Sequence, residues 1–458
     1  MASTYLTRTE SSGNRKTGTL SFWVKRNGLG NGSLNQYVYS NWNVSVGGYL
    51  SGLVQFSSAD SFEFSNYQES GTGTHTNLLT NKVFRDISAW YHIVVNWDTT
   101  QATSSDRYKM YINGVQETSF QTANYPSLNE DLYFNIGGAS NPVVIGSNYG
   151  NSTYFDGSMS HYHFIDGTAY DASAFGEYDA NGVWKINTSP SVTYGNNGFF
   201  ILKNGNSVTD QSGNGNNFTV AGGTLTNTED SPSNVFCTIN ALDNFYPNST
   251  ITNGNTTIAT ATSNRSYNTG TLSASSGKWY WEVKAVSNVQ SSQGCYIGIA
   301  STNPITNGVS GTVQTLGYWP YDYSFVSANG NLLNNNTQTS YGNSYTDNDI
   351  VGVAMDLDNN KLYFSINGVW QNSGDPTSGA TGTGAISIQD PSGTVNGVYS
   401  PGLGDFWVNG FTVSFNFGNG YFGTTAVASA GTNASGIGIF EYDVPTGYTA
   451  LSTKGLNL

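Results

Sequence analysis

Trp279-Tyr280-Trp281-Glu282-Val283 is the run that decides the fold of the C-terminal half of this chain. Its odd-numbered residues are large and apolar, and they alternate with Tyr280 and Glu282. A period of two places successive side chains on opposite faces of an extended strand. The run therefore predicts a strand with one face in a core and the other face toward water.

A second run, from Asp349 to Trp370, continues the same sheet. It reads as an apolar strand, a polar turn at Asp358 to Asn360, and a strand from Leu362 to Ile366 that ends at Asn367-Gly368. Asn-Gly readily takes the positive φ angles of a tight hairpin. The pattern predicts an antiparallel β-sandwich in this half.

The composition extends the all-β prediction to the whole chain. Aromatic residues make up 14% of the 458 residues, charged residues only 10%, and there are 55 glycines. These proportions suit short strands joined by tight turns, and no long segment shows helical periodicity. A chain of this length exceeds one ordinary core, so at least two domains are expected.

The N-terminal half has its own set of alternating strands. Residues 19–26 alternate, and in 90–98 the side chains of Tyr91, Ile93, Val95 and Trp97 share one face. Asn113-Gly114 is a second hairpin signal. Residues 224–233 are rich in Asn, Thr, Asp and Pro and poor in apolar residues, which favours a boundary there. We expect two antiparallel β-sandwich domains of jelly-roll type in tandem, 1–225 and 226–458.

Both halves resemble known families. Residues 236–458 resemble the SPRY domain family, whose "yWEV", "D-IGVA-DLD" and "L-F-NGV" motifs occur here in order. The N-terminal half resembles laminin-G-like, concanavalin-A-type sandwiches through "FWVK" at 22–25, "WYHIVVNWD" at 90–98 and "YING" at 111–114. SPRY domains are binding modules, so this resemblance implies recognition without catalysis.

The order of these domains is similar to one lineage of tailed bacteriophage virion proteins, particularly of marine phages. The segments 165–177, 182–184, 194–199, 212–216 and 231–234 carry this likeness. It implies a tail fibre or head appendage as the setting.

Charge, cysteine count and hydropathy disfavour nucleic-acid-binding, disulfide-rich, secreted and membrane-spanning classes of protein. The net charge of −14 disfavours nucleic acid as a partner. Cys237 and Cys295 are too few for a disulfide framework. The N-terminus lacks a secretory signal pattern, and no run approaches the roughly 18 apolar residues of a membrane span. We expect a soluble protein, made in the host cytoplasm and carried on the virion.

Catalytic and transition-metal patterns have little support. Concanavalin-A-like glycosidases need paired acids, and Glu177/Asp179 and Glu441/Asp443 each lack the third acid of that family's usual spacing. These carboxylates are more simply turn residues. His161 and His163 could form half of a metal site on a strand, but no cysteine or further histidine is near in sequence, so an ordinary strand face explains them better. We therefore expect no enzymatic activity and no obligatory cofactor.

Calcium is the one metal with a candidate site. Asp210, Asn214 and Asn216 place hard oxygen ligands on a glycine-rich turn. A turn in which these side chains bond their own backbone explains the same residues.

The densest aromatic segment lies in the SPRY-like half and is the candidate ligand site. Rings beside a carboxylate fit sugar recognition, and the SPRY resemblance implies aromatic loops on the ligand face. The alternative is that these rings fill a core. The candidates are Trp319, Tyr321, Asp322, Tyr323 and Trp370, with Trp407 as a weaker one.

Three functions follow from these patterns. The preferred one is a non-enzymatic phage tail fibre or surface appendage that binds a host-surface glycan or receptor and other virion proteins. We expect it to be a homo-oligomer or to occur in multiple copies per virion. The second is a head-decoration or other structural subunit that binds only virion proteins. A secreted polysaccharide-active enzyme is the third and has the least support.

Overall fold

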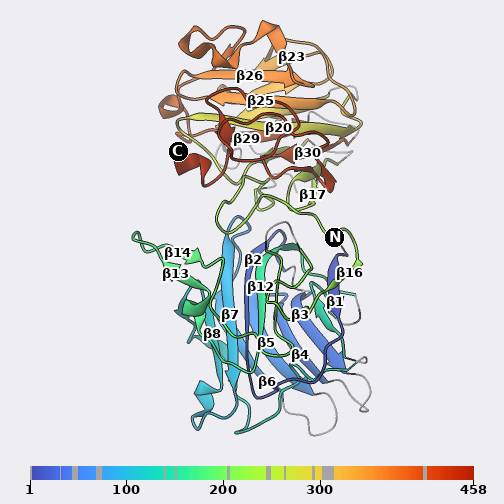
Figure 1. Cartoon of the computed structure of the whole chain (residues 1–458). Helices are drawn as coiled ribbons and strands as arrows, with labels where there is room; N and C mark the ends of the chain where they lie inside the picture. The colour runs from blue at the N-terminus through green and yellow to red at the C-terminus, as the bar shows by residue number, and fades with distance from the viewer. Residues whose placement is uncertain are drawn as a thin grey trace. The chain divides into compact units, whose positions relative to one another are not determined.

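The computed structural model describes most of the chain: residues 3–30, 32, 34–43, 50–68, 75–138, 141–148, 150, 152–203, 207–243, 249–261, 265–290, 294–301, 314–405 and 410–457. It divides into two compact units, Met1–Asn227 and Thr228–Leu458. The regular secondary structure of both units is almost entirely β-strand, with only short 3₁₀ turns besides, which confirms the predicted all-β class (Figure 1). No helix among the described residues is long and apolar enough to cross a membrane.

The first sheet of the N-terminal unit is antiparallel and has eight strands. In spatial order they are β10 (Phe120–Asn124), β6 (Thr76–Val83), β5 (Ser61–Gln68), β4 (Leu50–Phe56), β3 (Gln36–Asn43), β11 (Val143–Ile145), β1 (Tyr5–Arg8) and β16 (Thr219–Gly222).

The second sheet of this unit is also antiparallel and has six strands. They are β15 (Phe199–Ile201), β12 (Gly157–Asp166), β2 (Thr17–Arg26), β7 (Trp90–Asp98), β8 (Tyr108–Ile112) and β9 (Val115–Gln116). A short pair lies apart: β13 (Gly176–Tyr178) with β14 (Trp184–Ile186). The core between the sheets includes Ile93, Val95 and Trp97, so the face predicted for this strand is confirmed.

The larger sheet of the C-terminal unit has nine strands, with β20 at its centre. The main path is β17 (Thr250–Thr252), β18 (Thr257–Ala259), β30 (Thr412–Asn416), β20 (Lys278–Ser287), β25 (Ile350–Asp356), β26 (Lys361–Ile366) and β27 (Val369–Trp370); β28 (Ile386–Ser387) and β33 (Thr449–Ala450) branch from it. All of these strands pair antiparallel except β33, which pairs parallel to β20.

A six-stranded antiparallel sheet completes the second sandwich. It contains β19 (Tyr267–Thr269), β29 (Ser400–Asp405), β21 (Cys295–Ala300), β22 (Tyr323–Val326), β23 (Asn331–Asn334) and β24 (Thr337–Ser340). The remaining short elements are β31 (Tyr421–Phe422), β32 (Thr425–Ala426) and six 3₁₀ turns: η1 (Ser104–Asp106), η2 (Ala172–Ala174), η3 (Gln371–Ser373), η4 (Pro376–Thr381), η5 (Pro391–Gly393) and η6 (Gly455–Asn457).

Both predicted Asn-Gly hairpins are confirmed. Asn113 and Gly114 have φ angles of 48° and 83°, and Asn367 and Gly368 have 48° and 78°. A Cβ atom at Gly368 would lie 2.6 Å from Cδ1 of Tyr442. Glycine is therefore required there both for the backbone angle and for the space.

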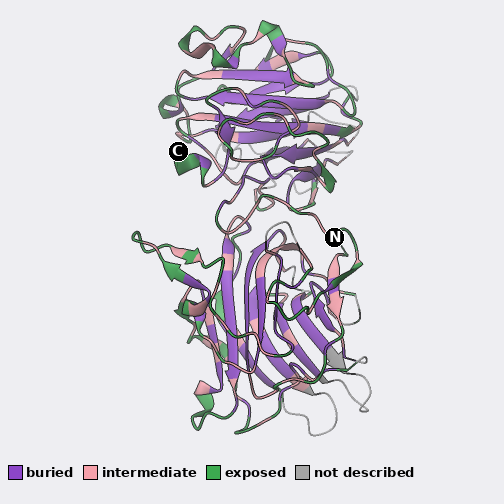
Figure 2. Ribbon diagram, viewed as in Figure 1, coloured by how far each residue is buried: buried purple, intermediate pink, exposed green. Residues whose placement is uncertain are grey.

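One sequence prediction about strand faces was wrong. The strand β20 was expected to turn Tyr280 and Glu282 toward water, but both side chains are buried, with 0% exposure. In Figure 2 the strands of the C-terminal unit are coloured as buried over most of their length. Residues from the C-terminal segment, including Phe440, Val444 and Tyr448, cover this face with a second apolar cluster. The alternation was read correctly, but a covering segment buries the second face as well.

The same happens on β7 of the N-terminal unit. Its second face carries Trp90, His92 and Val94, which are also buried. Ala172 and Phe175, which follow β12, pack there with Val94. Each unit thus has a core between its sheets and smaller clusters outside them: one in the N-terminal unit and two in the C-terminal unit.

Candidate functional site

The predicted aromatic site lies on the outer side of the six-stranded sheet of the C-terminal unit. Trp319 is half-buried and packs on a small cluster that includes Leu316 and Leu333. Its ring meets that of Tyr267 edge to face, with ring centroids 5.9 Å apart and an interplanar angle of 78°. Tyr321 is also half-exposed. These two rings are partly available to a ligand and partly engaged with the sheet.

Asp322 and Tyr323 are buried and cannot contact a ligand at the surface, which corrects the prediction that they are ligand contacts. Asp322 has 0% exposure, and its carboxylate accepts hydrogen bonds from the Tyr267 hydroxyl at 2.9 Å and the Ser301 amide at 3.1 Å. Tyr323 belongs to the main core. Strand β22 begins at Tyr323, and its residues are all buried. For these two residues, the alternative that the segment fills a core holds.

Trp370 is half-buried beside the second cluster rather than on an open face. Its ring lies edge to face with Tyr280 and Tyr363, at 6.4 Å in each case. Trp407 lies outside the described residues. Of the predicted residues, Trp319, Tyr321 and Trp370 are therefore partly exposed, whereas Asp322 and Tyr323 are buried.

The predicted calcium turn is held together by its own hydrogen bonds. Asp210 Oδ1 accepts from the backbone amides of Phe200 and Ser212, at 2.8 and 2.9 Å. Its Oδ2 accepts from the Ser212 hydroxyl at 2.7 Å and from the Asn216 amide at 2.9 Å. Both carboxylate oxygens already have two donors, so this geometry favours the hydrogen-bonded turn over calcium at Asp210.

The two asparagines of that turn also have partners. Nδ2 of Asn214 donates to the carbonyl oxygens of Gly195 and Gly198, at 2.7 and 2.9 Å. Oδ1 of Asn216 accepts from the Arg8 guanidinium at 2.8 Å. A calcium ion at Asn216 Oδ1 would displace this cationic donor.

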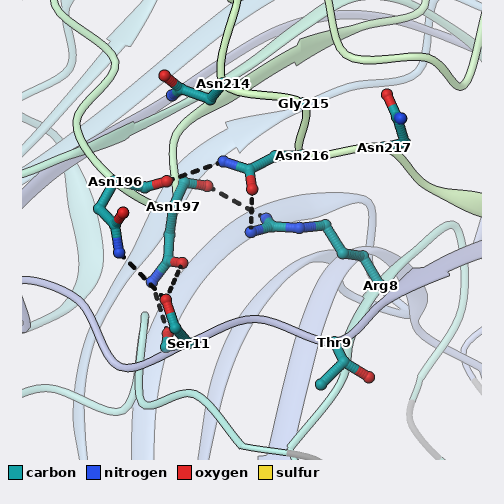
Figure 3. A pocket seen from close by; sticks show the side chains of 9 residues that line it. All are labelled: Arg8, Thr9, Ser11, Asn196, Asn197, Asn214, Gly215, Asn216 and Asn217. Atoms are coloured by element: carbon teal, nitrogen blue, oxygen red, sulfur yellow. Dashed lines mark hydrogen bonds between the residues drawn. The ribbon is translucent and has the colours of Figure 1, made fainter.

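A polar pocket of about 380 Å³ lies beside this turn in the N-terminal unit. Three segments line it: the end of β1 with the residues after it, the Asn196-Asn197 pair, and the tip of the glycine-rich turn (Figure 3). The lining residues are Arg8, Thr9, Ser11, Asn196, Asn197, Asn214, Gly215, Asn216 and Asn217. Amide and hydroxyl groups dominate, and the lining contains no Asp or Glu.

Arg8 organises the pocket. Its Nη2 donates to Asn216, and its Nη1 donates to the carbonyl oxygen of Asn197 at 3.2 Å (Figure 3). Ser11 donates to Oδ1 of Asn197 at 2.9 Å. Burial lowers the pKa of Arg8 from its usual value, and the nearby Glu10 carboxylate opposes that shift. The network fixes amide dipoles and one cation around a solvent-accessible hollow.

Asp179 and Asp443, two of the acidic residues considered for a glycosidase site, are hydrogen-bonded to neighbouring turns. Asp179 Oδ1 accepts from the amides of Asn181 and Val183, both at 2.9 Å. Asp443 Oδ1 accepts from the amide and hydroxyl of Thr432. These hydrogen bonds lower the pKa values of both aspartates, whereas a general acid needs a raised one. Both residues act as turn carboxylates.

The strand histidines pack as neutral rings. His163 stacks on Phe200 with ring centroids 3.9 Å apart, and its Nδ1 lies 2.9 Å from the Tyr194 hydroxyl. Burial lowers the pKa of His161 to about 4 and that of His163 well below its usual value. No group of three or more His, Cys, Asp or Glu side chains within the described ranges could hold a metal ion.

Sequence reasoning missed the pocket because its lining comes from three distant segments. Two of them carried a signal, since Asn196-Asn197 and residues 214–217 are unusually rich in asparagine. Arg8 carried none, because a single arginine at the end of a short strand has no distinguishing pattern. Only the pairing of β1 with β16 and β11 brings Arg8 to the turn.

Comparisons with known proteins match this architecture. Residues 1–173 match the family model described as Concanavalin A-like lectin/glucanases superfamily, and residues 278–386 match the model of the SPRY domain. A search of curated proteins finds no match.

Several solved structures are similar to parts of the chain. The SPRY domain of human HERC1 has 14% identity over 36% of this chain and 91% of its own, with a TM-score of 0.28. A native heptameric SAP-like pentraxin from Limulus polyphemus has 14% identity over 36% of this chain and 71% of its own, with a TM-score of 0.25. From the two family models, the chain carries a laminin-G-like, concanavalin-A-like domain in its N-terminal unit and a SPRY domain in its C-terminal unit.

Proposed function

We propose that this chain is a non-enzymatic bacteriophage virion protein, a tail fibre or surface appendage, that binds a glycan on the host surface. The observation that carries the binding role is the pocket of the N-terminal unit, lined by Arg8, Thr9, Ser11 and asparagines. Carbohydrate hydroxyls both donate and accept hydrogen bonds, and side-chain amides provide both functions in fixed positions. Both domain families are typical of binding modules.

The lining also supports binding over hydrolysis. Glycoside hydrolysis needs two carboxyl groups roughly 5 to 9.5 Å apart across the bond that is cleaved. The pocket lining contains neither Asp nor Glu. An arrangement of amides and one guanidinium can orient a sugar, but it has no group with which to protonate a leaving oxygen.

Trp319 and Tyr321 are a second contact region in this proposal. Half-exposed rings can stack on the apolar face of a sugar. The phage setting is supported by the likeness of segments 165–177 and 212–216 to virion proteins, and calcium at the Asp210 turn is not part of the proposal.

Two experiments test this function. Labelled chain is applied to an array of bacterial lipopolysaccharides and capsular polysaccharides, and we expect saturable binding to a subset without release of sugar. Antibody labelling of the phage particles, imaged by electron microscopy, should decorate exposed appendages. Labelling on the head shell together with no binding to any polysaccharide would favour the decoration-subunit alternative.

A further inference from the structure

Arg8 is the one charged residue among the described residues that line the pocket of the N-terminal unit. Its guanidinium makes two hydrogen bonds, from Nη1 to the carbonyl oxygen of Asn197 at 3.2 Å and from Nη2 to Oδ1 of Asn216 at 2.8 Å (Figure 3). The ring of Phe199 supports it, with Cζ of Arg8 5.9 Å from the ring centroid. A guanidinium carries five N–H donors. Most of them, including the one on Nε, therefore have no acceptor within the described residues.

The positive charge of Arg8 is not paired. Both of its acceptors are neutral, whereas Arg85, for comparison, forms an ion pair with Asp60 at 3.0 Å. Burial lowers the pKa of Arg8, and the attraction of Glu10 and Asp210 offsets that effect only in part. A partly buried cation without an anion in contact is unfavourable. An anionic group bound in the pocket would remove this cost.

The two nearby acids do not supply the counter-charge inside the pocket. Neither Glu10 nor Asp210 belongs to its lining. Both oxygens of Asp210 accept hydrogen bonds from the glycine-rich turn. Burial raises the pKa of Glu10 to about 7, so its carboxyl group is about half protonated at neutral pH. The lining itself therefore keeps a positive formal charge.

Further donors line the same pocket. Oδ1 of Asn217 accepts from the Asp210 amide at 2.8 Å, which fixes the orientation of this side-chain amide. Asn217 is exposed, and its Nδ2 group has no acceptor among the described residues. The hydroxyl of Thr9, also exposed, has no partner in this part of the chain. These groups can donate to further oxygens of a ligand.

Two lining asparagines present acceptors instead. Nδ2 of Asn196 donates to Ser11 Oγ at 3.1 Å, and Nδ2 of Asn214 donates to the carbonyl oxygen of Gly195 at 2.7 Å. Their Oδ1 atoms accept from no group that the structure describes, and both side chains are exposed. Sugar hydroxyls can donate to such oxygens. The pocket thus combines donors and one cation with acceptors for hydroxyl groups.

We propose that this pocket takes an acidic sugar residue, whose carboxylate or phosphate accepts hydrogen bonds from Arg8. This inference rests on the glycan-binding function proposed above and narrows it to one class of glycan. Hydrogen bonds between a guanidinium and an oxyanion are among the strong ones, and the planar guanidinium suits carboxylate and phosphate oxygens better than an ammonium group does. The volume of about 380 Å³ lies within the usual range of small-ligand sites.

The test compares native and neutralised glycans on the full chain. Each polysaccharide that the wild type binds on the array is tested again after reduction of its carboxyl groups to alcohols, and separately after removal of its phosphates with hydrofluoric acid. We expect the bound polysaccharides to be acidic. One of the two treatments should weaken binding roughly 10- to 100-fold, which also identifies the charged group.

Variants then assign the effect to Arg8. Arg8→Gln should lose a similar factor for the native polysaccharide and should no longer distinguish it from the neutralised one. Arg8→Lys keeps the charge but loses the planar fork, so we expect an intermediate affinity. Arg85→Gln is the matched control, because it removes the same charge from a side chain that is 59% exposed and does not line the pocket. The native and neutralised glycans are compared on the wild type, so this arm does not depend on the folding of any variant.

The outcomes separate this inference from the glycan-binding function. Wild-type binding that survives both treatments, or an Arg8→Gln chain that keeps its melting temperature and its affinity, would overturn the acidic-sugar inference and leave glycan binding intact. An equal loss in Arg85→Gln and Arg8→Gln would overturn it in favour of attraction by overall charge. Binding to no polysaccharide would overturn the proposed function and this inference together.

Discussion

Replacing Glu282 by alanine tests how the C-terminal segment is held on the SPRY sheet. The Glu282 carboxylate accepts from the backbone amides of Glu441 and Tyr442, both at 2.8 Å. It also accepts from the Tyr280 hydroxyl at 3.1 Å and from Nδ2 of Asn416 at 3.3 Å. One side chain of the "WEV" strand therefore fixes two consecutive amides of a segment about 160 residues away.

The magnitude follows from the donors that the substitution leaves behind. Glu282→Ala leaves two part-buried amides and the buried Tyr280 hydroxyl without an acceptor. Each fully buried group of this kind costs about 1 to 3 kcal/mol, and a part-buried one costs less. Entry of water and relief from burying the carboxylate offset part of this cost. We expect the free energy of unfolding of the C-terminal unit to fall by about 3 to 5 kcal/mol, in the range that marks loss of a buried network.

The assay is denaturant unfolding of the full chain at pH 8. Burial raises the pKa of Glu282 to about 7, so the carboxylate is mostly ionised at this pH. Tyr280→Phe removes a single donor and should cost about 1 to 2 kcal/mol. Glu441→Gln is the matched control, because that half-exposed side chain accepts one amide and keeps an oxygen, so we expect a change within about 0.5 kcal/mol.

Hydrogen exchange supplies a second readout for the same substitution. The amides of Glu441 and Tyr442 should exchange faster in Glu282→Ala than in the wild type, while amides in the N-terminal unit stay unchanged. A loss below about 1 kcal/mol for Glu282→Ala, with those two amides still protected, would refute the reasoning.

Three further predictions concern other parts of the chain. Lowering the pH from 7 to 5 should destabilise the N-terminal unit, because burial lowers the pKa of His92 to about 3, whereas the same histidine in the unfolded chain takes up a proton below about pH 6.5. The contribution of His92 should lower the free energy of unfolding by roughly 2 kcal/mol. A free energy of unfolding that does not change with pH would contradict the burial of His92 as a neutral ring. Gly368→Ala should lower the free energy of unfolding by about 1 to 2 kcal/mol more than Gly397→Ala, as measured by thermal unfolding. Both glycines have positive φ, but only Gly368 lies against a neighbouring ring. Equal losses of stability in the two variants would exclude that contact. Trp319→Ala should lower the stability of the C-terminal unit by about 2 kcal/mol, which is less than the loss for a fully buried tryptophan, and should also weaken glycan binding. Unchanged melting together with unchanged binding would exclude Trp319 both from packing on the sheet and from contact with the glycan.

The alternation in the sequence was enough to predict the main sandwich faces. On β7, Ile93, Val95 and Trp97 lie in the core as expected. Asn-Gly pairs marked the hairpins because few other residues adopt consecutive positive φ angles. These features are local, so a single stretch of sequence contains the information.

Burial of the opposite faces could not be predicted in this way. Glu282 and His92 are polar residues in strands, and a polar residue opposite a core normally faces water. Whether an irregular segment covers them depends on contacts between distant parts of the chain. Trp184 illustrates this, since its Nε1 donates to Nδ1 of His92 at 2.9 Å from 92 residues away.

The candidate site shows the same limit. The aromatic segment was recognised from composition, but composition cannot distinguish half-exposed Trp319 from fully buried Asp322. Asn214 and Asn216 were singled out correctly as a polar turn, whereas the pocket that they help to line needs Arg8 from the opposite end of the domain.

Glycan binding by the wild-type chain and by Thr9→Trp tests the central proposal most directly. Thr9 is exposed and lines the pocket, so an indole there should fill the hollow without breaking the network around Arg8. Thr118→Trp is the matched control, because it places the same ring on an exposed loop residue that does not line the pocket. We expect Thr9→Trp to lose at least tenfold in affinity for the polysaccharide that the wild type selects on the array, which is about 1.4 kcal/mol, with melting unchanged and Thr118→Trp behaving as the wild type. Full affinity in Thr9→Trp would contradict recognition at this pocket.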